Sequence, residues 1–251
     1  MSGALEGRTA IVTGGAHNIG RQIVLALAAE GASVVINAQS SGAEAEALAE
    51  QIRQSGGRAL AHLADVTSEP AVNGLAAAAA EFGGGIDILV NNAAIRRETP
   101  FEALGYAEWK EVLTVILDGA FLCSKAVLPH IRASSAGSII NIGGLSAHTG
   151  SPGRAHVVAA KSGLAGLTRA LAHDLAADGI TVNCVVPGLI DTVRGQSTGG
   201  TPAMHSQHRT LVGRRGRPEE VAALVCFLCG PNARYLTGQT MHANGGAFLN
   251  S

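Results

Sequence analysis

Short apolar runs rich in β-branched residues alternate along this chain with longer segments rich in alanine and leucine. The apolar runs are continuous, which is typical of parallel strands that are covered on both faces. Their alternation with helices predicts βαβ units in an α/β fold, with one doubly wound parallel sheet of about seven strands and helices on both faces. The expected strands are TAIVTG, SVVINA, ALAHLA, DILVNN, SIINIG, TVNCVV and one in the tail TGQTMHANGGAFLNS; the expected helices include 19–30, 41–54, 107–132, 155–177 and 217–229.

The composition favours a single globular domain over residues 1–251. Hydrophobic residues make up 47% of the chain and charged residues 15%, which is enough to bury a large core. A net charge of -1 with only short basic pairs provides no footprint for nucleic acid. No basic N-terminal segment precedes a long apolar run, and no uninterrupted apolar window approaches ~18 residues. We therefore expect a soluble, cytoplasmic protein without a membrane segment.

The cysteines do not predict a disulfide framework or a metal site. Cys123, Cys184, Cys226 and Cys229 are few and lie in apolar surroundings. The pair in CFLC has the spacing of a redox or metal pair, but it lies in an expected helix and has no second ligand pair. We predict buried thiols.

One stretch, residues 193–213, does not fit the alternation of strand and helix. Its glycine, serine and threonine content predicts a loop or short helices. In a doubly wound sheet it would follow the end of a strand, where ligands bind. It is either a substrate lid or an ordinary surface loop.

A glycine-rich turn joins the first strand directly to the first helix. Gly14 and Gly20 allow close approach of the backbone, and the N-terminus of the helix offers free N–H groups and the positive end of its dipole. A pyrophosphate is the ligand that such a turn suits.

Four motifs in this order identify a resemblance over essentially the full length. TGGAHNIG (13–20), ADV (64–66), NNAA (91–94) and PGLIDT (187–192) resemble motifs of the short-chain dehydrogenase/reductase family, and the chain is similar to its 3-oxoacyl-carrier-protein reductase-like members. Asn18 replaces the middle glycine of the turn, and asparagine tolerates a left-handed backbone. The resemblance implies a Rossmann fold and a nicotinamide dinucleotide. The residues assigned to it are Gly14, His17, Asn18, Ile19, Gly20, Ala38, Gln39, Asp65, Val66, Asn92, Ala93, Lys161, Pro187, Gly188, Ile190 and Thr192.

The end of the second strand bears on which nicotinamide cofactor is bound. An unphosphorylated ribose usually contacts a carboxylate there, and Ala38 stands at that position. His17, Arg21 and the neutral Gln39 and Ser40 would accommodate a 2′-phosphate, and simple solvation of His17 and Arg21 is the slightly less favoured alternative. NADP is the expected cofactor, with NAD as the alternative.

Three polar groups that the family uses in catalysis are absent. Four residues before Lys161, where relatives carry a tyrosine, stands Val157. Gly144 occupies the position of the family's serine, and Ile116 that of an asparagine on the preceding long helix. In the relatives a phenol, its pKa lowered from near 10 by the lysine, protonates the alkoxide. Ordinary ketone reduction by that route is therefore not expected.

Four residues remain as candidates for catalysis. Lys161 is expected to bind the nicotinamide ribose, as the family's lysine does. Ser146, His148 and His156 lie in the same segment and are candidates for a proton relay. His156 is alternatively a capping or interface residue, because neighbouring helical residues point about 100° apart.

Arginines are expected at the substrate end of the sheet. Arg96, Arg154 and Arg194 fall on loops there and would suit a carboxylate or phosphate, or form a solvated rim. The predicted function is NAD(P)-dependent hydride transfer to or from a small, anionic carbonyl or alcohol substrate. The alternatives are reduction of an activated C=C bond, or a non-catalytic dinucleotide-binding sensor or assembly partner. The resemblance also implies a homotetramer, or a homodimer, paired through the two long helices.

Overall fold

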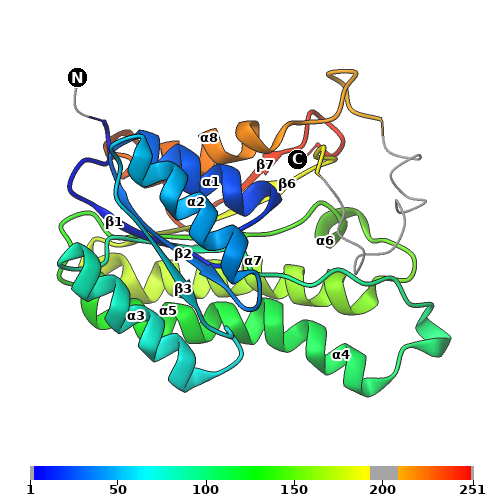
Figure 1. Cartoon of the computed structure of the whole chain (residues 1–251). Coiled ribbons are helices and arrows are strands. Elements are labelled where there is room, and N and C mark those ends of the chain that lie inside the picture. The colour runs from blue at the N-terminus through cyan, green and yellow to red at the C-terminus, as the bar shows by residue number, and fades with distance from the viewer. Residues whose placement is uncertain (1–2, 193–208, 250–251) are drawn as a thin grey trace.

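A single seven-stranded parallel sheet forms the centre of the molecule (Figure 1). The computed structural model describes residues 3–192 and 209–249. Its strands lie in the order β3-β2-β1-β4-β5-β6-β7. The predicted doubly wound sheet is thereby confirmed. The strands are β1 (Thr9–Val12), β2 (Ser33–Ala38), β3 (Ala59–Leu63), β4 (Ile88–Asn91), β5 (Ser138–Ile142), β6 (Thr181–Pro187) and β7 (Thr240–Ala243).

Helices cover both faces of this sheet (Figure 1). They are α1 (Asn18–Ala29), α2 (Gly42–Gln54), α3 (Glu69–Gly83), α4 (Tyr106–Leu113), α5 (Gly119–Ile131), α6 (Ser146–Thr149), α7 (Ala155–Leu175) and α8 (Pro218–Cys229). Helices α1, α2 and α8 contribute to the core on one face, and α3, α5 and α7 to the core on the other. The expected helices therefore form within a few residues of their predicted bounds.

The apolar runs are continuous because both faces of each central strand are buried. On β2, Val34 and Ile36 belong to the core beneath α1, α2 and α8, and Val35 between them belongs to the opposite core. Consecutive strand residues point to opposite faces, so a strand buried on both sides needs an apolar residue at every position.

The long helix expected at 107–132 contains a break in its hydrogen bonding. A π-helical turn, Thr114–Asp118, separates α4 from α5. By length and composition the stretch Tyr106–Ile131 could cross a membrane, but core helices of soluble proteins pass the same test. Here Cys123, Val127 and Ile131 of this helix are buried in the core beside α3.

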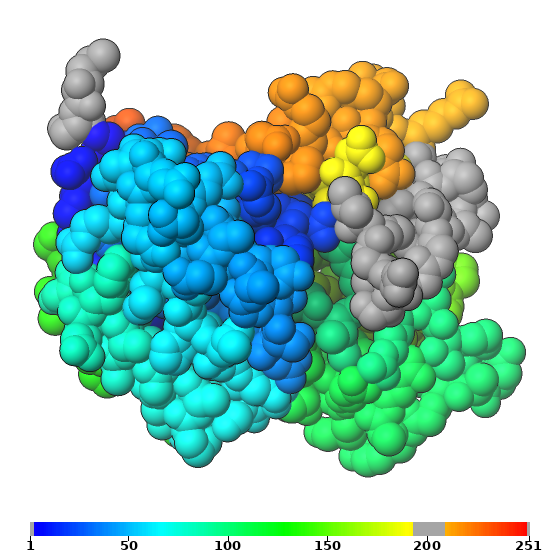
Figure 2. All heavy atoms as spheres, viewed as in Figure 1, coloured from blue at the N-terminus to red at the C-terminus, as the bar shows by residue number. Residues whose placement is uncertain are grey.

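The carboxyl ends of the central strands position the site. Strand succession reverses between β1 and β4, and the crevice above such a switch point is where doubly wound sheets bind ligands. Figure 2 shows the surface hollowed between the N-terminal segments in blue and the segment around α4 in green. Of the lid expected at 193–213, residues 193–208 lie outside the described part of the chain.

Candidate active site

The turn after β1 has the backbone that its glycines and Asn18 predict. Gly14 has φ +60°, and a Cβ added at Gly20 would lie 2.3 Å from the Gly14 carbonyl oxygen. Asn18 has φ +49° and is the one non-glycine residue with positive φ in the described ranges. The side chain of His17, the N-cap of α1, makes no capping hydrogen bond. The N–H groups of this first helical turn therefore suit a pyrophosphate.

The segment after β4 holds this turn in place. The backbone N–H groups of Asn92 and Ala93 donate to Thr13 Oγ1 at 2.9 and 3.0 Å. The amide of Asn92 donates in turn to the carbonyl oxygens of Thr13 and Gly14, both at 2.9 Å. The NNAA segment thus fixes the shape of the dinucleotide-binding turn.

The carboxyl end of β2 carries no carboxylate. Ala38 is buried there, and the Gln39 amide donates to Asp65 Oδ2 at 3.0 Å. Asp65 also accepts hydrogen bonds from the backbone and hydroxyl of Thr67, which lower its pKa. His17 Nε2 lies 3.0 Å from Ser41 Oγ. The end of β2 therefore carries neutral side chains, with Asp65 the nearby carboxylate, held by Gln39 and Thr67.

Val66 and Arg21 serve packing and surface contacts. Val66 is buried in the core beside α3 and lies close to Gly119, where an added Cβ would come within 2.9 Å of its side chain. Arg21 donates to Gln51 Oε1 on α2 at 2.8 Å.

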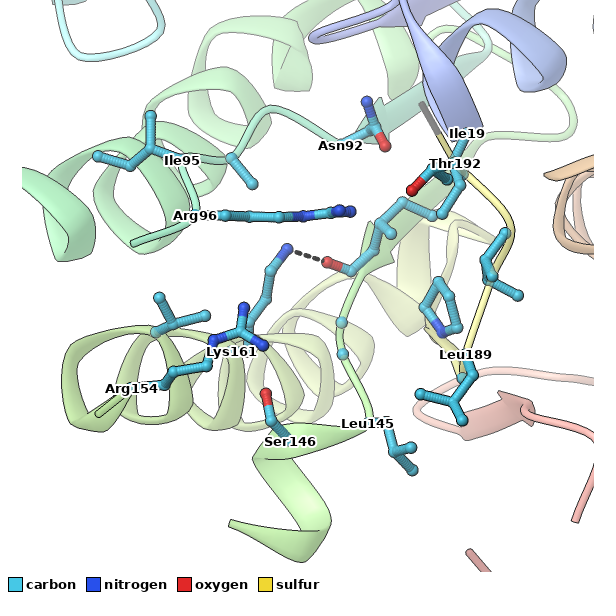
Figure 3. Close-up of a pocket in the computed structure, with 18 residues that line it drawn as sticks. Ile19, Asn92, Ile95, Arg96, Leu145, Ser146, Arg154, Lys161, Leu189 and Thr192 are labelled. Atoms are coloured by element: carbon cyan, nitrogen blue, oxygen red, sulfur yellow. Dashed lines mark hydrogen bonds between the residues drawn. The ribbon is translucent and has the colours of Figure 1, made fainter. Parts of the chain in front are cut away.

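A pocket opens where the ends of β4, β5 and β6 meet the start of α7 (Figure 3). Several separate sequence motifs contribute to its wall, as the sequence predicts for a single site. The lining consists of Ile19, Asn92, Ala94, Ile95, Arg96, Ile142, Gly143, Gly144, Leu145, Ser146, Arg154, Val157, Lys161, Pro187, Gly188, Leu189, Ile190 and Thr192.

The PGLIDT segment forms one wall of this pocket. A Cβ added at Gly188 would lie 2.5 Å from the Asn244 Cα, so only glycine lets the end of β6 approach the residue that follows β7. Ile190 pairs with Gly216 in an isolated parallel bridge. These contacts hold Thr192 at the pocket.

Lys161 is buried in the floor of the pocket, with 8% of its surface exposed. Its ammonium donates to the carbonyl oxygen of Ile142 at the end of β5. Burial, together with the nearby Arg96 and Arg154, lowers the pKa of Lys161 to about 8, while Cys184 acts in the opposite sense. This lysine is therefore a buried cation close to its neutral form at physiological pH.

Val157 faces the pocket one helical turn before Lys161. It is 3% exposed and shares an apolar cluster with Ile116 and Ala160. A Cβ added at Gly144 would meet only Lys161 Cγ, at 3.8 Å, so a larger side chain has room there. The pocket floor is thus apolar around the one lysine.

The three relay candidates separate in the structure. Ser146 lines the pocket and is buried. The ring of His148 packs against those of His242 and Phe248, with centroids 4.5 and 5.6 Å away, and burial lowers its pKa. Neither His148 nor His156 belongs to the pocket lining.

The position of His156 corrects the expectation that it could serve the vacant tyrosine position. Its side chain is fully buried, and Nε2 lies 3.3 Å from Glu108 Oε1 on α4. The same carboxylate oxygen of Glu108 accepts a hydrogen bond from Thr99 Oγ1 at 2.7 Å. Neighbouring helical residues diverge by about 100°, so His156 faces α4 while Val157 faces the pocket.

Two of the three predicted substrate arginines reach the pocket. Figure 3 shows Arg96 extending across it above Lys161, with Arg154 on the side of α7. Arg97 pairs instead with Glu111 at the surface. Arg194 lies outside the described residues. Three cationic side chains thus line one pocket.

Sequence reasoning missed the apolar part of the lining. Ile95, Leu145 and Leu189 carry no chemical signature, but each adjoins a motif at the carboxyl end of a strand. That proximity is the signal that would have found them.

Comparison with known proteins agrees with this geometry. A family model described as enoyl-(acyl carrier protein) reductase matches residues 14–247. The chain is 39% identical over 247 residues to a 3-oxoacyl-[acyl-carrier-protein] reductase of Synechocystis, covering 98% of this chain and 99% of that protein. It is 37% identical over 252 residues to the enzyme of the same name from Vibrio cholerae, covering 98% and 99%.

Solved structures extend the likeness to three dimensions. A dehydrogenase/reductase from Sinorhizobium meliloti has a TM-score of 0.91 at 37% identity, covering 98% of this chain and 96% of that one. A short chain dehydrogenase from Burkholderia cenocepacia in complex with NADP has a TM-score of 0.90 at 36% identity, covering 97% and 99%. With the glycine turn, the segment that holds it and the buried lysine in one site, the chain belongs to the short-chain dehydrogenase/reductase family of NAD(P)-dependent oxidoreductases.

Proposed function

We propose that this protein transfers a hydride between NADP and a small, anionic carbonyl or alcohol substrate without a catalytic phenol. One observation carries the proposal. A single pocket joins the cofactor motifs, represented by Asn92 and Thr192, to Lys161 and two arginines. Its relatives are named reductases of 3-oxoacyl groups. A 3-oxo compound is therefore the first carbonyl class to test.

The chain's own residues would hold the cofactor. The turn from Gly14 to Gly20 would receive the pyrophosphate, because its helical N–H groups have no side-chain cap. The surroundings of Ala38 favour NADP, since a carboxylate there would repel a 2′-phosphate. Thr192 and Lys161 would hold the nicotinamide end. When bound, the reduced nicotinamide supplies the hydride.

The reacting end departs from the family in the residues that move protons. Val157, Gly144 and Ile116 stand where relatives carry tyrosine, serine and asparagine. Ser146 and Lys161 are the proposed catalytic residues that line the pocket. His148 and His156 lie off its lining, so a role for either would act through other groups.

The two arginines of the pocket are the reason for proposing an anionic substrate. In Figure 3 Arg96 crosses the pocket above Lys161, and Arg154 lies on the side of α7. A guanidinium offers paired donors that match a carboxylate or a phosphate. An anion at this place would also offset the repulsion among the three cations. We expect it to be the group that orients the substrate for hydride transfer.

The proposed assembly is a homotetramer, or a homodimer, formed through Tyr106–Ile131 and α7, in the cytoplasm. Phe121 on α5 is 49% exposed in the isolated chain, with Lys125 Nζ 6.0 Å from its ring centroid. A Phe121→Lys substitution should therefore lower the molar mass measured by light scattering. An unchanged mass would argue against this interface.

The test begins with fluorescence titrations of NADPH and NADH. Acetoacetate and its neutral methyl ester then form a matched substrate pair, alongside a panel of ketones, enones and alcohols followed by nicotinamide absorbance. We expect tighter binding of NADPH and a preference for the acid over the ester.

The variant Arg154→Met should raise KM for the acid roughly 10- to 100-fold, the strength of a charged hydrogen bond, and leave KM for the ester unaffected. Turnover of enones alone would favour the C=C reductase. Tight NADPH binding without any turnover would favour the non-catalytic sensor or assembly partner. Absence of NADPH binding would overturn the proposed function altogether.

A further inference from the structure

We propose that Lys161 is itself the proton donor of this site, taking over the chemical task of the phenol that the chain lacks. This inference rests on the proposed function, because it concerns the same reaction. In carbonyl reduction the carbon gains a hydride with its electron pair, and the C=O π pair moves to the oxygen. The N–H bond of the ammonium breaks, a new O–H bond forms, and water returns a proton to the amine.

The ionisable side chains in the lining of the pocket support this assignment. Among the described residues that line it, the ionisable side chains are Arg96, Arg154 and Lys161. A guanidinium keeps its proton, since its pKa lies above about 12. Ser146 has a hydroxyl, but a serine without an adjacent base is a weak acid. Lys161 is therefore the side chain in this described lining that can release a proton near neutral pH.

Lys161 is anchored by one hydrogen bond and lines the pocket beneath Arg96. The Ile142 carbonyl accepts one of its three N–H donors and so anchors the ammonium at the end of β5. Val157, one helical turn earlier, has no group that could take or pass a proton. No side chain at Gly144 covers the stem of the lysine. In Figure 3 the ammonium points into the pocket, towards the side chain of Arg96.

The surrounding charges tune this group towards proton release. Arg96 on the segment after β4 and Arg154 before α7 both disfavour its charged form, and burial does so more strongly. Cys184 on β6 acts in the opposite sense, but burial raises its own pKa to about 11, so it is a neutral thiol at pH 8. With a pKa of about 8, Lys161 is near the value at which an acid is most useful at physiological pH.

A bound anionic substrate would change the pKa of Lys161. An anion held by Arg96 and Arg154 would weaken their repulsion of the ammonium and raise the proton affinity of Lys161. Substrate would thus arrive with a charged, proton-bearing lysine, and the release of an anionic product would restore the easily deprotonated form.

The experiment uses the fact that the chain has only three lysines, Lys110, Lys125 and Lys161. In protein labelled with 13C-lysine, the three Cε signals are followed against pH with and without NADPH. The signal missing in Lys161→Arg assigns Lys161. We expect its midpoint near pH 8 in the free protein. In the NADPH complex we expect a midpoint that coincides with the fall of kcat/KM for acetoacetate reduction as pH rises.

The variant Lys161→Arg keeps a cation for the cofactor but cannot release its proton. It should bind NADPH within a few-fold of wild type, lose at least about 100-fold in kcat, and lose the pH break. Lys125→Arg, on the surface of α5, is the matched control. It should leave NADPH binding, kcat and the pH dependence of kcat/KM unchanged. A Lys161→Arg enzyme with kcat near wild type, or a Lys161 signal that stays protonated to pH 10 in the complex, overturns this inference and leaves the proposed function standing. A wild-type protein without turnover overturns both.

Discussion

The two ends of the active-site crevice are built in opposite ways. At the nucleotide end, Thr13 and Asn92 join the turn to β4 through four hydrogen bonds within 3.0 Å, and polar groups are paired within the chain. At the catalytic end, Val157 and Ile116 are apolar, and the charged side chains among the described residues of the pocket lining are all positive. Binding of the dinucleotide and the chemistry performed on it are therefore separable properties in this fold, each with its own residues.

The strongest test of that separation restores the phenol. A Val157→Tyr, Gly144→Ser double substitution should raise ketone reduction by at least about 100-fold, the usual scale of general acid catalysis. Gly144 has room for the hydroxymethyl group. The matched control is Val157→Phe with the same serine, which adds the ring without the hydroxyl. Steady-state kinetics measure the rates of both variants. Equal rates for the tyrosine and phenylalanine variants would contradict the prediction that the phenol restores ketone reduction.

At the other end, Gly20→Ala should remove cofactor binding. Its Cβ would lie 2.3 Å from the Gly14 carbonyl oxygen, so the turn must shift away from the geometry that receives the pyrophosphate. We expect the NADPH dissociation constant to rise by about 100-fold or more, equivalent to roughly 3 kcal/mol.

Gly74→Ala on α3 is the matched control, because its Cβ would meet nothing within 4 Å. In a helix that substitution should stabilise by roughly 0.5–1 kcal/mol and leave NADPH binding unchanged. Fluorescence titration measures binding, and circular dichroism establishes that both variants are folded. Unimpaired binding by Gly20→Ala would show that the turn is not the pyrophosphate site.

A third prediction concerns the hydrogen bonds that hold the turn. Thr13→Val keeps the shape of a side chain that is 1% exposed but removes the acceptor for the N–H groups of Asn92 and Ala93. Two donors that lose their partner should lower the free energy of unfolding by about 1–3 kcal/mol, with weaker NADPH binding as a consequence. Urea unfolding measures the first effect. A neutral result would mean that water replaces the hydroxyl.

The smallest expected effect is the pH dependence of stability at the catalytic end. The pKa of Lys161 is about 8 in the folded protein against 10.5 ordinarily. Between these values the unfolded chain binds more protons, so the free energy of unfolding should rise with pH, by at most about 1.4 kcal/mol per unit. Below pH 8 both states are protonated and this contribution is flat.

The Lys161→Met variant isolates that contribution. The difference in unfolding free energy between wild type and variant should be level from pH 6.5 to 7.5 and should grow from pH 8 to 9. The range ends at pH 9 because the buried thiols, whose pKa values are raised, act in the opposite direction above it. A difference that does not change with pH would mean that Lys161 is not perturbed in the folded protein.

Much of the fold could be predicted from local signals. Every expected strand formed, because β-branched runs buried on both faces of a parallel sheet leave a continuous apolar pattern. The left-handed backbone of Asn18 could also be anticipated, since few other residues adopt it. We expected one continuous helix over 107–132, and the π-helical turn Thr114–Asp118 within it was not predicted.

The candidate site, like the fold, could be predicted from the sequence only in part. The structure brings Asn92, Lys161, Gly188 and Thr192 into the lining of one pocket, since the carboxyl ends of parallel strands meet at one edge; their binding of the cofactor stays a prediction. Adjacency along the chain misled at His156, because the direction of a helical side chain depends on which neighbour the helix packs against.

The sequence by itself determined the sheet, the dinucleotide turn and the absence of a phenol at position 157, because each depends only on residue types and their spacing along the chain. Only the tertiary structure decided that His156 faces α4, that Arg96 and Arg154 share a pocket with Lys161, and that this lysine is buried. These outcomes depend on distances between segments far apart in the chain. Burial and the sum of nearby charges set the proton affinity of Lys161, and both exist only once the chain has folded.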